Sequence, residues 1–295
     1  MRDKPLVSIV TPSYNQGRFI EDTILSVKNQ DYPNIEHIVV DGGSTDNTLD
    51  ILKKYEGTYN MRWISEPDEG QSDAINKGFR MAKGEIIGWL NSDDVYFTRD
   101  VISYVVKRFK KFPHADFIYG NCAYIDVDNN IFRVLRRSQR DYNKLFRGFS
   151  LSQPASFTRR KVILKNKLDK NLHFTMDFEF WLRVGRKCNF MYVDKILAAS
   201  RVHRHRKTIS GKDKLEVERR TVMRKYGLKF DLKYYILRYF FDFPDLMTRK
   251  VFGIVDILKI QKNLDNLDLA FRGKCDKNKL NLIYSQTSPE FMLKL

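Results

Sequence analysis

The sequence lacks the features that mark disulfide-rich, zinc-binding and membrane-spanning proteins. Only three cysteines occur in 295 residues, far apart and without a Cys-x-x-Cys pair, so neither a disulfide framework nor a zinc knuckle is indicated. The N-terminus has no apolar signal segment, and no run approaches the roughly 18 apolar residues of a membrane span. We therefore expect a cytoplasmic protein that neither crosses a membrane nor is secreted by that route.

The motifs of several ligand classes are missing as well. There is no G-x-G-x-x-G turn and no P-loop, so a dinucleotide or ATP site would lack its phosphate-binding turn. The net charge is +17, yet no helix-turn-helix, zinc-finger or aromatic RNA-binding signature accompanies it. We therefore expect no nucleic-acid partner.

The positive charge is concentrated in the second part of the chain. Residues 1–100 contain 11 Lys and Arg against 17 Asp and Glu, whereas residues 101–295 contain 42 against 19. Such a surface can meet an anionic membrane face or a phosphorylated substrate. The aromatic and basic segment 234–241 fits peripheral binding to the inner face of a membrane, a helix packed on the rest of the protein, or a dimer contact.

Strand-like and helix-like segments alternate through the first hundred residues, which predicts an α/β fold with a parallel sheet. We expect strands at residues 6–10, 35–40, 61–64 and 85–90, and helices at 19–27, 45–52 and 70–82. Beyond residue 100 we expect helices at 101–109 and 176–186, a hairpin of 117–125 with 131–135, a strand at 189–202, and a linker at 207–214. A helical tail is expected from about residue 215.

Two adjacent carboxylates, Asp93 and Asp94, follow the predicted strand at 85–90, where an open α/β sheet binds ligands. Ionised carboxylates side by side repel each other, so they persist at such a place when they are solvated or when a cation neutralises them. A hard divalent metal that carries a diphosphate is the natural occupant. The alternative is that the two residues cap a helix that begins near residues 99–100.

Four short segments lie at a strand end or on the helix that follows it: residues 8–15, 39–46, 71–78 and 89–94. In order and spacing they resemble family 2 of inverting nucleotide-sugar glycosyltransferases with the GT-A fold, over about residues 5–205. The resemblance implies an α/β fold of GT-A type, with a mostly parallel Rossmann-like sheet flanked by helices and a helical C-terminal appendage. It implies a glycosyltransferase domain at 1–210, with a nucleotide-binding part to about 100 and an acceptor part at about 101–210, followed by a basic, aromatic region at 211–295.

The resemblance also implies residues that bind the nucleotide sugar. Asp41 would recognise the nucleoside, although it could instead cap the next helix. Thr11 and Tyr14, which we expect on the loop after the first strand, would pack against the base, or would serve only the turn around Pro12. Asp73 would contact the donor sugar, or would simply suit the first turn of its helix.

In the family the metal site is a D-x-D motif, and here its first position is Asn91. This residue and Ser92 can still contact the donor, but Asp93 must supply the main anionic ligand to Mn²⁺ or Mg²⁺. By resemblance, His203 is a second metal ligand, and its basic neighbours would hold the departing diphosphate. The alternative for His203 is a solvated basic strand end. Asp94 would cap or orient.

The segment 175–183 resembles the family's acidic segment that carries the catalytic base. Met176 replaces its first acid and Asp177 matches the second, so Asp177 is the predicted base. The alternative is a role for Asp177 at the helix start, with Glu179 as the base instead. The segment 153–157 resembles a stretch near the acceptor side, and we assign it no chemistry.

These observations predict an inverting glycosyltransferase that moves a sugar from a nucleoside diphosphate sugar, most simply a UDP-sugar, to a hydroxyl acceptor. The acceptor would be a glycan or a lipid-linked molecule in the synthesis of a cell-surface polysaccharide. A sugar nucleotidyltransferase would want a glycine-rich basic loop after the first strand, which residues 12–15 are not. An inactive sugar-nucleotide-binding or scaffold protein stays open because of Asn91 and Met176.

Overall fold

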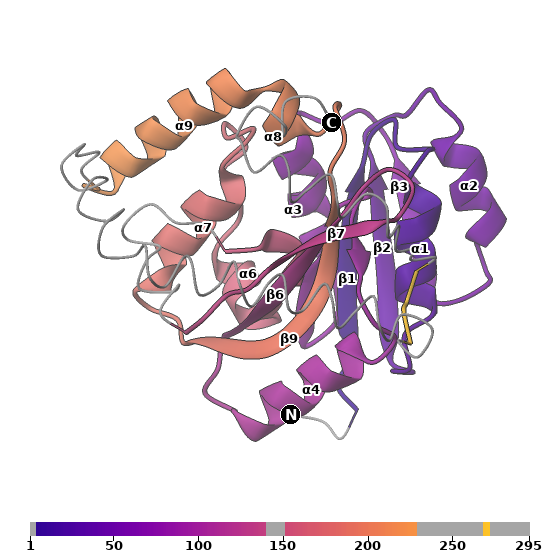
Figure 1. Cartoon of the computed structure of the whole chain (residues 1–295), viewed down its shortest axis with the longest axis horizontal. Helices are drawn as coiled ribbons and strands as arrows, with labels where there is room; N and C mark the ends of the chain where they lie inside the picture. Colours follow the sequence, from indigo (N-terminus) through magenta and orange to yellow (C-terminus); the bar gives the residue numbers. More distant parts are fainter. Residues whose placement is uncertain (1–3, 140–150, 229–267, 272–295) are drawn as a thin grey trace.

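The molecule is built around one mixed β-sheet with helices on both faces (Figure 1). The computed structural model describes residues 4–139, 151–228 and 268–271. Its strands are β1 (Val7–Ser13), β2 (Ile35–Asp41), β3 (Met61–Ser65), β4 (Ile86–Trp89), β5 (Val95–Tyr96), β6 (Phe117–Ile125), β7 (Ile131–Leu135), β8 (Ser156–Arg159) and β9 (Phe190–Arg201). Its helices are α1 (Ile20–Lys28), α2 (Thr48–Tyr55), α3 (Gln71–Met81), α4 (Val101–Lys111), α6 (Arg160–Lys165), α7 (Met176–Gly185), α8 (Lys207–Ser210) and α9 (Lys212–Lys225), with a 3₁₀ turn η1 (Gln153–Ala155).

The first four strands form the parallel half of the sheet, in the order β3-β2-β1-β4. Successive side chains of a strand point to opposite faces. Val10 and Val40 therefore pack against α3 on one face. On the other face, Ile9 packs in a cluster with residues of α4, and Val39 packs in a cluster with residues of α1 and α2. Every residue of β1 is buried, as expected for a strand covered on both faces. The predicted parallel sheet is confirmed.

The second half of the sheet mixes strand directions. The strand β8, which the sequence did not predict, lies antiparallel between β4 and β6. The strands β6 and β9 are parallel, and β5 closes the order β4-β8-β6-β9-β5. The predicted hairpin is present as β6 and β7. Since β8 is only four residues long, it offers too little alternation to be recognised from the sequence.

Two local predictions are wrong. The segment expected as a linker at 207–214 contains α8 and the start of α9, because Val222 and Met223 bury their side chains in the same apolar cluster as α7 and so dock α9 on the domain. Thr11 was expected on a loop, but it is a fully buried residue of β1, which extends three residues further than predicted. Its hydroxyl lies 2.9 Å from Nε2 of His37 inside the sheet.

The described part of the C-terminal region is small. Leu269 pairs with Thr98, and Phe271 packs near Phe97, so residues 268–271 contact the segment that follows β5. The aromatic segment 234–241 and most of the predicted helical appendage lie outside the described residues. Within the residues described, no helix has both the length and the apolar character needed to cross a membrane.

Candidate active site

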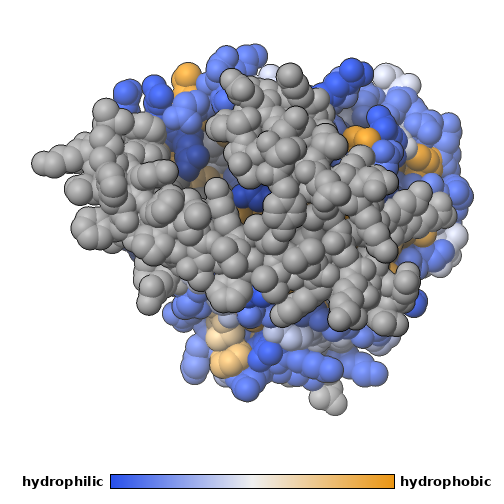
Figure 2. Space-filling model, viewed as in Figure 1, coloured by the Kyte–Doolittle hydropathy of each residue, from blue (hydrophilic) through white to orange (hydrophobic). Residues whose placement is uncertain are grey.

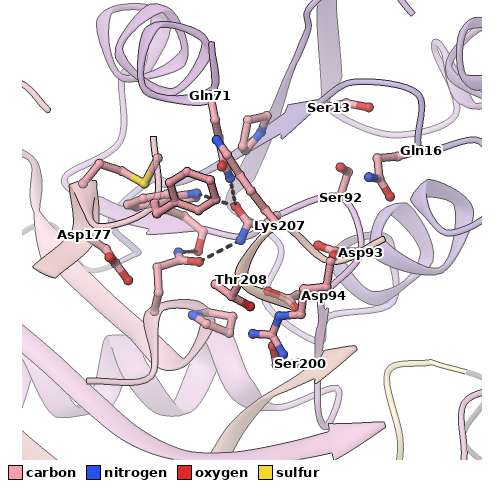
Figure 3. Close-up of a pocket in the computed structure, with 18 of the residues that line it drawn as sticks. Ser13, Gln16, Gln71, Ser92, Asp93, Asp94, Asp177, Ser200, Lys207 and Thr208 are labelled. Atoms are coloured by element: carbon pink, nitrogen blue, oxygen red, sulfur yellow. Dashed lines mark hydrogen bonds between the residues drawn. The ribbon is translucent and has the colours of Figure 1, made fainter. Parts of the chain in front are cut away.

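A pocket of about 800 Å³ opens at the carboxyl ends of β1, β2 and β4. The start of α7 and the α8 segment line it as well (Figure 3). Of the residues predicted from the sequence, it brings together Tyr14, Asn91, Ser92, Asp93, Asp177 and His203. The other three, Thr11, Asp41 and Asp73, are not among its lining residues.

Asp93 and His203 meet on one side of this pocket. Nε2 of His203 lies 3.1 Å from Oδ2 of Asp93, and the imidazole ring stands 4.8 Å from that of Phe19. Nδ1 of His203 is buried without a hydrogen-bond partner in the part of the chain that the structure describes. A carboxylate next to an imidazole ring is a suitable pair of ligands for Mn²⁺.

The described residues contain no group of three or more His, Cys, Asp or Glu side chains placed to hold a metal ion. Two protein ligands are the expected number for an ion that is bound mainly through substrate phosphates, because Mg²⁺ commonly takes one or two carboxylates and completes its shell with phosphates and water. The pair of Asp93 and His203 therefore fits an ion that arrives with a diphosphate.

Asp94 does not cap a helix, because β5 separates it from α4. Its Oδ1 accepts the backbone N–H of Arg201 at 3.0 Å, and its side chain is buried. Burial and the neighbouring Asp93 raise the pKa of Asp94. Of the two roles predicted for Asp94, capping a helix or orienting its neighbours, this contact fits the second, because it holds the end of β9 at Arg201.

Arg201 is not available to hold a diphosphate, contrary to the expectation for the basic residues around His203. Its side chain is fully buried, and it donates hydrogen bonds to Asp22 (3.0 Å), to Asn129 (2.6 Å) and to the carbonyl oxygen of Asp93 (3.1 Å). A buried guanidinium needs such partners because desolvation disfavours its charge. Arg201 instead fixes the backbone at Asp93.

Asn91 forms the centre of a hydrogen-bond network on the pocket wall. Its Oδ1 accepts hydrogen bonds from Gln71 Nε2 (3.0 Å) and from the indole N–H of Trp89 (2.9 Å), while its Nδ2 donates to Oε1 of Gln153 (3.2 Å). Nε2 of Gln153 donates in turn to the carbonyl oxygen of Trp89 (2.6 Å). Because Gln153 is oriented by that last bond, position 91 must donate as well as accept, which an ionised carboxylate cannot do.

This network makes the change Asn91→Asp testable. At pH 8 a carboxylate would face Oε1 of Gln153, so we expect the free energy of unfolding to fall by about 1–3 kcal/mol. The repulsion raises the folded-state pKa of the new carboxyl above its unfolded value of about 3.9, and only the protonated form can donate to Gln153. The loss should therefore shrink as the pH falls toward 4. Urea unfolding of both proteins at several pH values measures it, and a loss independent of pH would contradict the network.

Asp177 lies in the first turn of α7, on the opposite side of the pocket from Asp93 (Figure 3). Its Oδ1 accepts the backbone N–H of Phe178 at 2.7 Å. Burial raises the pKa of Asp177 to about 6, because desolvation disfavours the charged form. A carboxyl with this pKa is ionised near neutral pH and is a stronger base than an ordinary aspartate.

Glu179, the alternative base, points away from this chemistry. Its carboxylate is 1% exposed, is paired with Arg183 at 3.0 Å, and accepts a hydrogen bond from the hydroxyl of Tyr226. It is not among the residues that line the pocket. Glu179 therefore joins α7 to the end of α9, and Asp177 is the carboxylate of this helix that faces the cavity.

The three predicted residues outside the pocket have partners within the protein. Asp41 accepts hydrogen bonds from Ser65 Oγ (2.7 Å) and from Ser44 N (2.8 Å), so it braces the turn after β2. Asp73 is ion-paired with Lys170 at 2.8 Å and with Lys77 at 3.4 Å. Each carboxylate thus shapes the wall behind the pocket.

Several lining residues were not predicted. Gln71, Gln153, Arg206 and Lys207 line the pocket, and burial lowers the pKa of Lys207. A signal for the first two was present, because the segments 71–78 and 153–157 had both been singled out. The α8 residues had no such signal, since an amphipathic pattern cannot form over four residues.

Comparison with known proteins gives the same picture. The family model described as glycosyl transferase family 2 matches residues 8–184. An uncharacterized glycosyltransferase of Rickettsia felis is 31% identical over 214 residues, which are 68% of this chain and 34% of that protein. A chondroitin synthase of Pasteurella multocida is 28% identical over 194 residues, which are 65% of this chain and 20% of that protein. The chain thus spans about a third or less of the length of these relatives.

Solved structures share the fold. TarS of S. aureus, residues 1–349 in complex with UDP-GlcNAc, matches with a TM-score of 0.59 at 19% identity, covering 74% of this chain and 65% of that one. The mannosyltransferase PcManGT of Pyrobaculum calidifontis, in complex with GDP-Man and Mn²⁺, matches with a TM-score of 0.55 at 16% identity, covering 82% and 81%. The predicted α/β fold of GT-A type is confirmed.

Proposed function

This chain belongs to glycosyl transferase family 2, and from that premise we propose that it transfers a sugar from a nucleoside diphosphate sugar to a hydroxyl acceptor with inversion. One observation carries the proposal: Asp177 and the pair of Asp93 and His203 line the same pocket from opposite sides. Inversion requires a base and a leaving-group site on opposite faces of the reacting carbon. A pocket with a free carboxylate on one side and a metal-binding pair on the other meets that requirement.

Asp177 acts as the base. Its carboxylate takes the proton of the acceptor hydroxyl while the oxygen attacks the anomeric carbon, and the bond from that carbon to the diphosphate breaks on the far face. With a pKa of about 6, Asp177 is ionised at neutral pH and ready to accept that proton. The protein must then receive a diphosphate that carries additional negative charge.

Asp93 and His203 are the residues that would hold a divalent ion beside the diphosphate. When bound, Mn²⁺ or Mg²⁺ neutralises charge on the leaving group. Arg201 and Asp94 hold the backbone beside these ligands in place. Arg206 and Lys207, which also line the pocket, add positive charge toward the same leaving group.

Tyr14 presents its ring to the nucleoside. It directly follows β1, lines the pocket and is 61% exposed. Where the described surface is visible in Figure 2, it is mostly hydrophilic, and its apolar residues are scattered. An exposed aromatic ring at the mouth of a polar pocket suits stacking with a nucleobase. Asn91 and Ser92 contact the donor from the end of β4, whereas Thr11, Asp41 and Asp73 support the walls.

The donor that we expect is a UDP-sugar, and the acceptor a glycan or a lipid-linked molecule used in building a cell-surface polysaccharide. The similarity to a chondroitin synthase and to TarS bound to UDP-GlcNAc supports this choice. The complex of PcManGT with GDP-Man and Mn²⁺ makes GDP-mannose the second donor to test.

Donor and metal binding are tested together by thermal unfolding of the full chain. UDP-GlcNAc, GDP-mannose and dTDP-glucose are each added with and without Mn²⁺. A ligand at 100 times its dissociation constant stabilises the native protein by about 2.7 kcal/mol, so one donor should raise the melting temperature clearly, and more so with Mn²⁺. The absence of a shift with every donor would contradict the proposal. Release of the nucleoside diphosphate then separates an enzyme from a protein that only binds the donor.

A further inference from the structure

One carboxylate of α9 holds the segment that leads into α7. Oε2 of Glu218 accepts the backbone N–H of His173 at 2.8 Å. Its Oε1 accepts the backbone N–H groups of Phe174 (2.8 Å) and Thr175 (2.7 Å) and also the Thr175 hydroxyl (2.7 Å). Four donors from three consecutive residues therefore converge on a single side chain, and the helix that carries Asp177 begins with the next residue.

The charge of Glu218 strengthens this contact. Burial by itself would raise the pKa of Glu218, but the hydrogen bonds from His173, Phe174 and Thr175 lower it below its ordinary value. The side chain is therefore anionic across the neutral range. Hydrogen bonds to an ionised acceptor are roughly twice as strong as neutral ones.

Two further contacts join the α8 and α9 region to the same part of α7. Gly211 approaches Phe174 so closely that a Cβ atom would lie 2.3 Å from Cε1 of the ring. The guanidinium of Arg219 lies 5.6 Å from the centroid of the Phe178 ring. Phe174 and Phe178 lie before and after Asp177 in the sequence. The region of α8 and α9 therefore contacts the chain on both sides of Asp177.

We propose that Glu218 is a positioning residue for the base: by fixing residues 173–175 from α9, it sets where the carboxylate of Asp177 stands relative to the acceptor hydroxyl. This inference rests on the role of Asp177 in the proposed function. A displacement of about 1 Å in a reacting group can lower the rate roughly 10²-fold, so a contact outside the reacting atoms can control it.

The charges of α9 act on Asp177 in opposite directions. Burial raises the pKa of Asp177; Arg219 lowers it and Glu218 raises it. The other titratable and charged residues that line the pocket stay the same in the variants of Glu218, Arg219 and Glu216: Asp68, Asp93, Asp94, Arg137, His173, His203, His205, Arg206 and Lys207. Neutralising Glu218 should therefore lower the pKa of Asp177, and neutralising Arg219 should raise it.

The test is the pH dependence of nucleoside diphosphate release from the donor selected in the thermal screen, with the full chain. In Glu218→Gln, the amide nitrogen cannot accept the N–H of His173. We expect kcat to fall roughly 10- to 100-fold, the dissociation constant of the donor to stay unchanged, and the acid limb of the profile to move to lower pH. Arg219→Gln should move that limb to higher pH.

Glu216→Gln is the matched control, because it removes the same charge from the same helix, where Glu216 pairs with Arg220. Its profile should equal that of the wild type. A Glu218→Gln profile that also equals the wild type overturns the proposal. If Glu218→Gln does not fold, Glu218→Asp decides, because it keeps the charge but shortens the side chain that accepts the four hydrogen bonds. A kcat equal to that of the wild type in Glu218→Asp overturns the proposal. Full activity of Asp177→Asn would instead overturn the base assignment itself.

Discussion

Replacing Asp177 by Asn should reduce donor turnover by about 10² to 10⁴, the usual contribution of a general base. The donor should still bind with nearly its normal dissociation constant, because Asp177 lies across the pocket from Asp93 and His203 (Figure 3). Single-turnover release of the nucleoside diphosphate, together with a donor titration, measures the two quantities separately. An equal loss of donor affinity would mean that Asp177 binds the donor.

The rate of the wild type should depend on pH through the ionisation of Asp177. Asp177 must be deprotonated to act, and burial raises its pKa to about 6, so the rate of the wild type should fall about tenfold per pH unit below pH 6. The limb should vanish in Asp177→Asn. An inflection near pH 4 in the wild type would indicate that the general base is a carboxyl with an ordinary pKa.

Stability serves as the control for this variant. The folded-state pKa of Asp177 lies above its unfolded value of about 3.9, so its ionisation destabilises the native state as the pH rises toward and through 6. The Asn side chain does not titrate. Asp177→Asn should therefore be at least as resistant to urea as the wild type at pH 8, and Glu179→Gln, which breaks a buried pairing with Arg183, should be less resistant. A rate loss confined to Glu179→Gln would move the base two residues along.

Replacing Asp93 by Ala should weaken Mn²⁺-dependent donor binding by roughly 10²-fold or more, because it removes the anionic member of a two-ligand set. Binding measured without Mn²⁺ should change much less. The fold should survive, since the Asp93 carboxylate bonds to His203 and Arg201 contacts only the backbone oxygen of Asp93. Calorimetric titration of the selected donor with and without Mn²⁺ gives both constants.

Asp68→Asn is the control for this second variant. Asp68 lines the same pocket and accepts the backbone N–H of Gly70, a bond that the Asn oxygen can also accept. The change removes one negative charge without touching His203, so the effect of Mn²⁺ should stay near that of the wild type. If both variants lose the metal effect equally, general pocket charge rather than a defined ligand pair would be responsible.

Much of the first half of the fold was predictable, because its strands and helices are long enough to show their periods. The residues 35–40 and 61–64 became β2 and β3 with one residue added at the end of each. The same local patterns failed at β8 and α8, which are four residues long and are held by neighbours distant in the sequence. Short elements carry too few residues for a period to stand out from chance.

The site divides in a similar way. The carboxylates that follow β4 were predicted from their place after an apolar strand, and Asp177 was predicted from the resemblance of the segment 175–183 to the family's acidic segment. The local sequence did not predict the orientation of the other polar side chains. Asp41 and Asp73 bond to partners within the protein, whereas Gln153 and Lys207 line the pocket. A side chain's direction is set by which partner is within reach, and those partners lie tens of residues away.

By itself, the sequence determined the class of fold, the positions of its first strands along the chain, and two carboxylates that line the pocket, Asp93 and Asp177. Tertiary structure alone decided that the amides of Gln71 and Gln153 hold Asn91, that Arg201 is buried against Asp22 across 179 residues, and that Glu218 reaches back to the start of α7. The physical reason is the range of the forces. The periodicity of a helix or strand and the signals at its ends depend on residues a few positions apart. Burial and hydrogen bonding join residues that are brought together only by the folded chain.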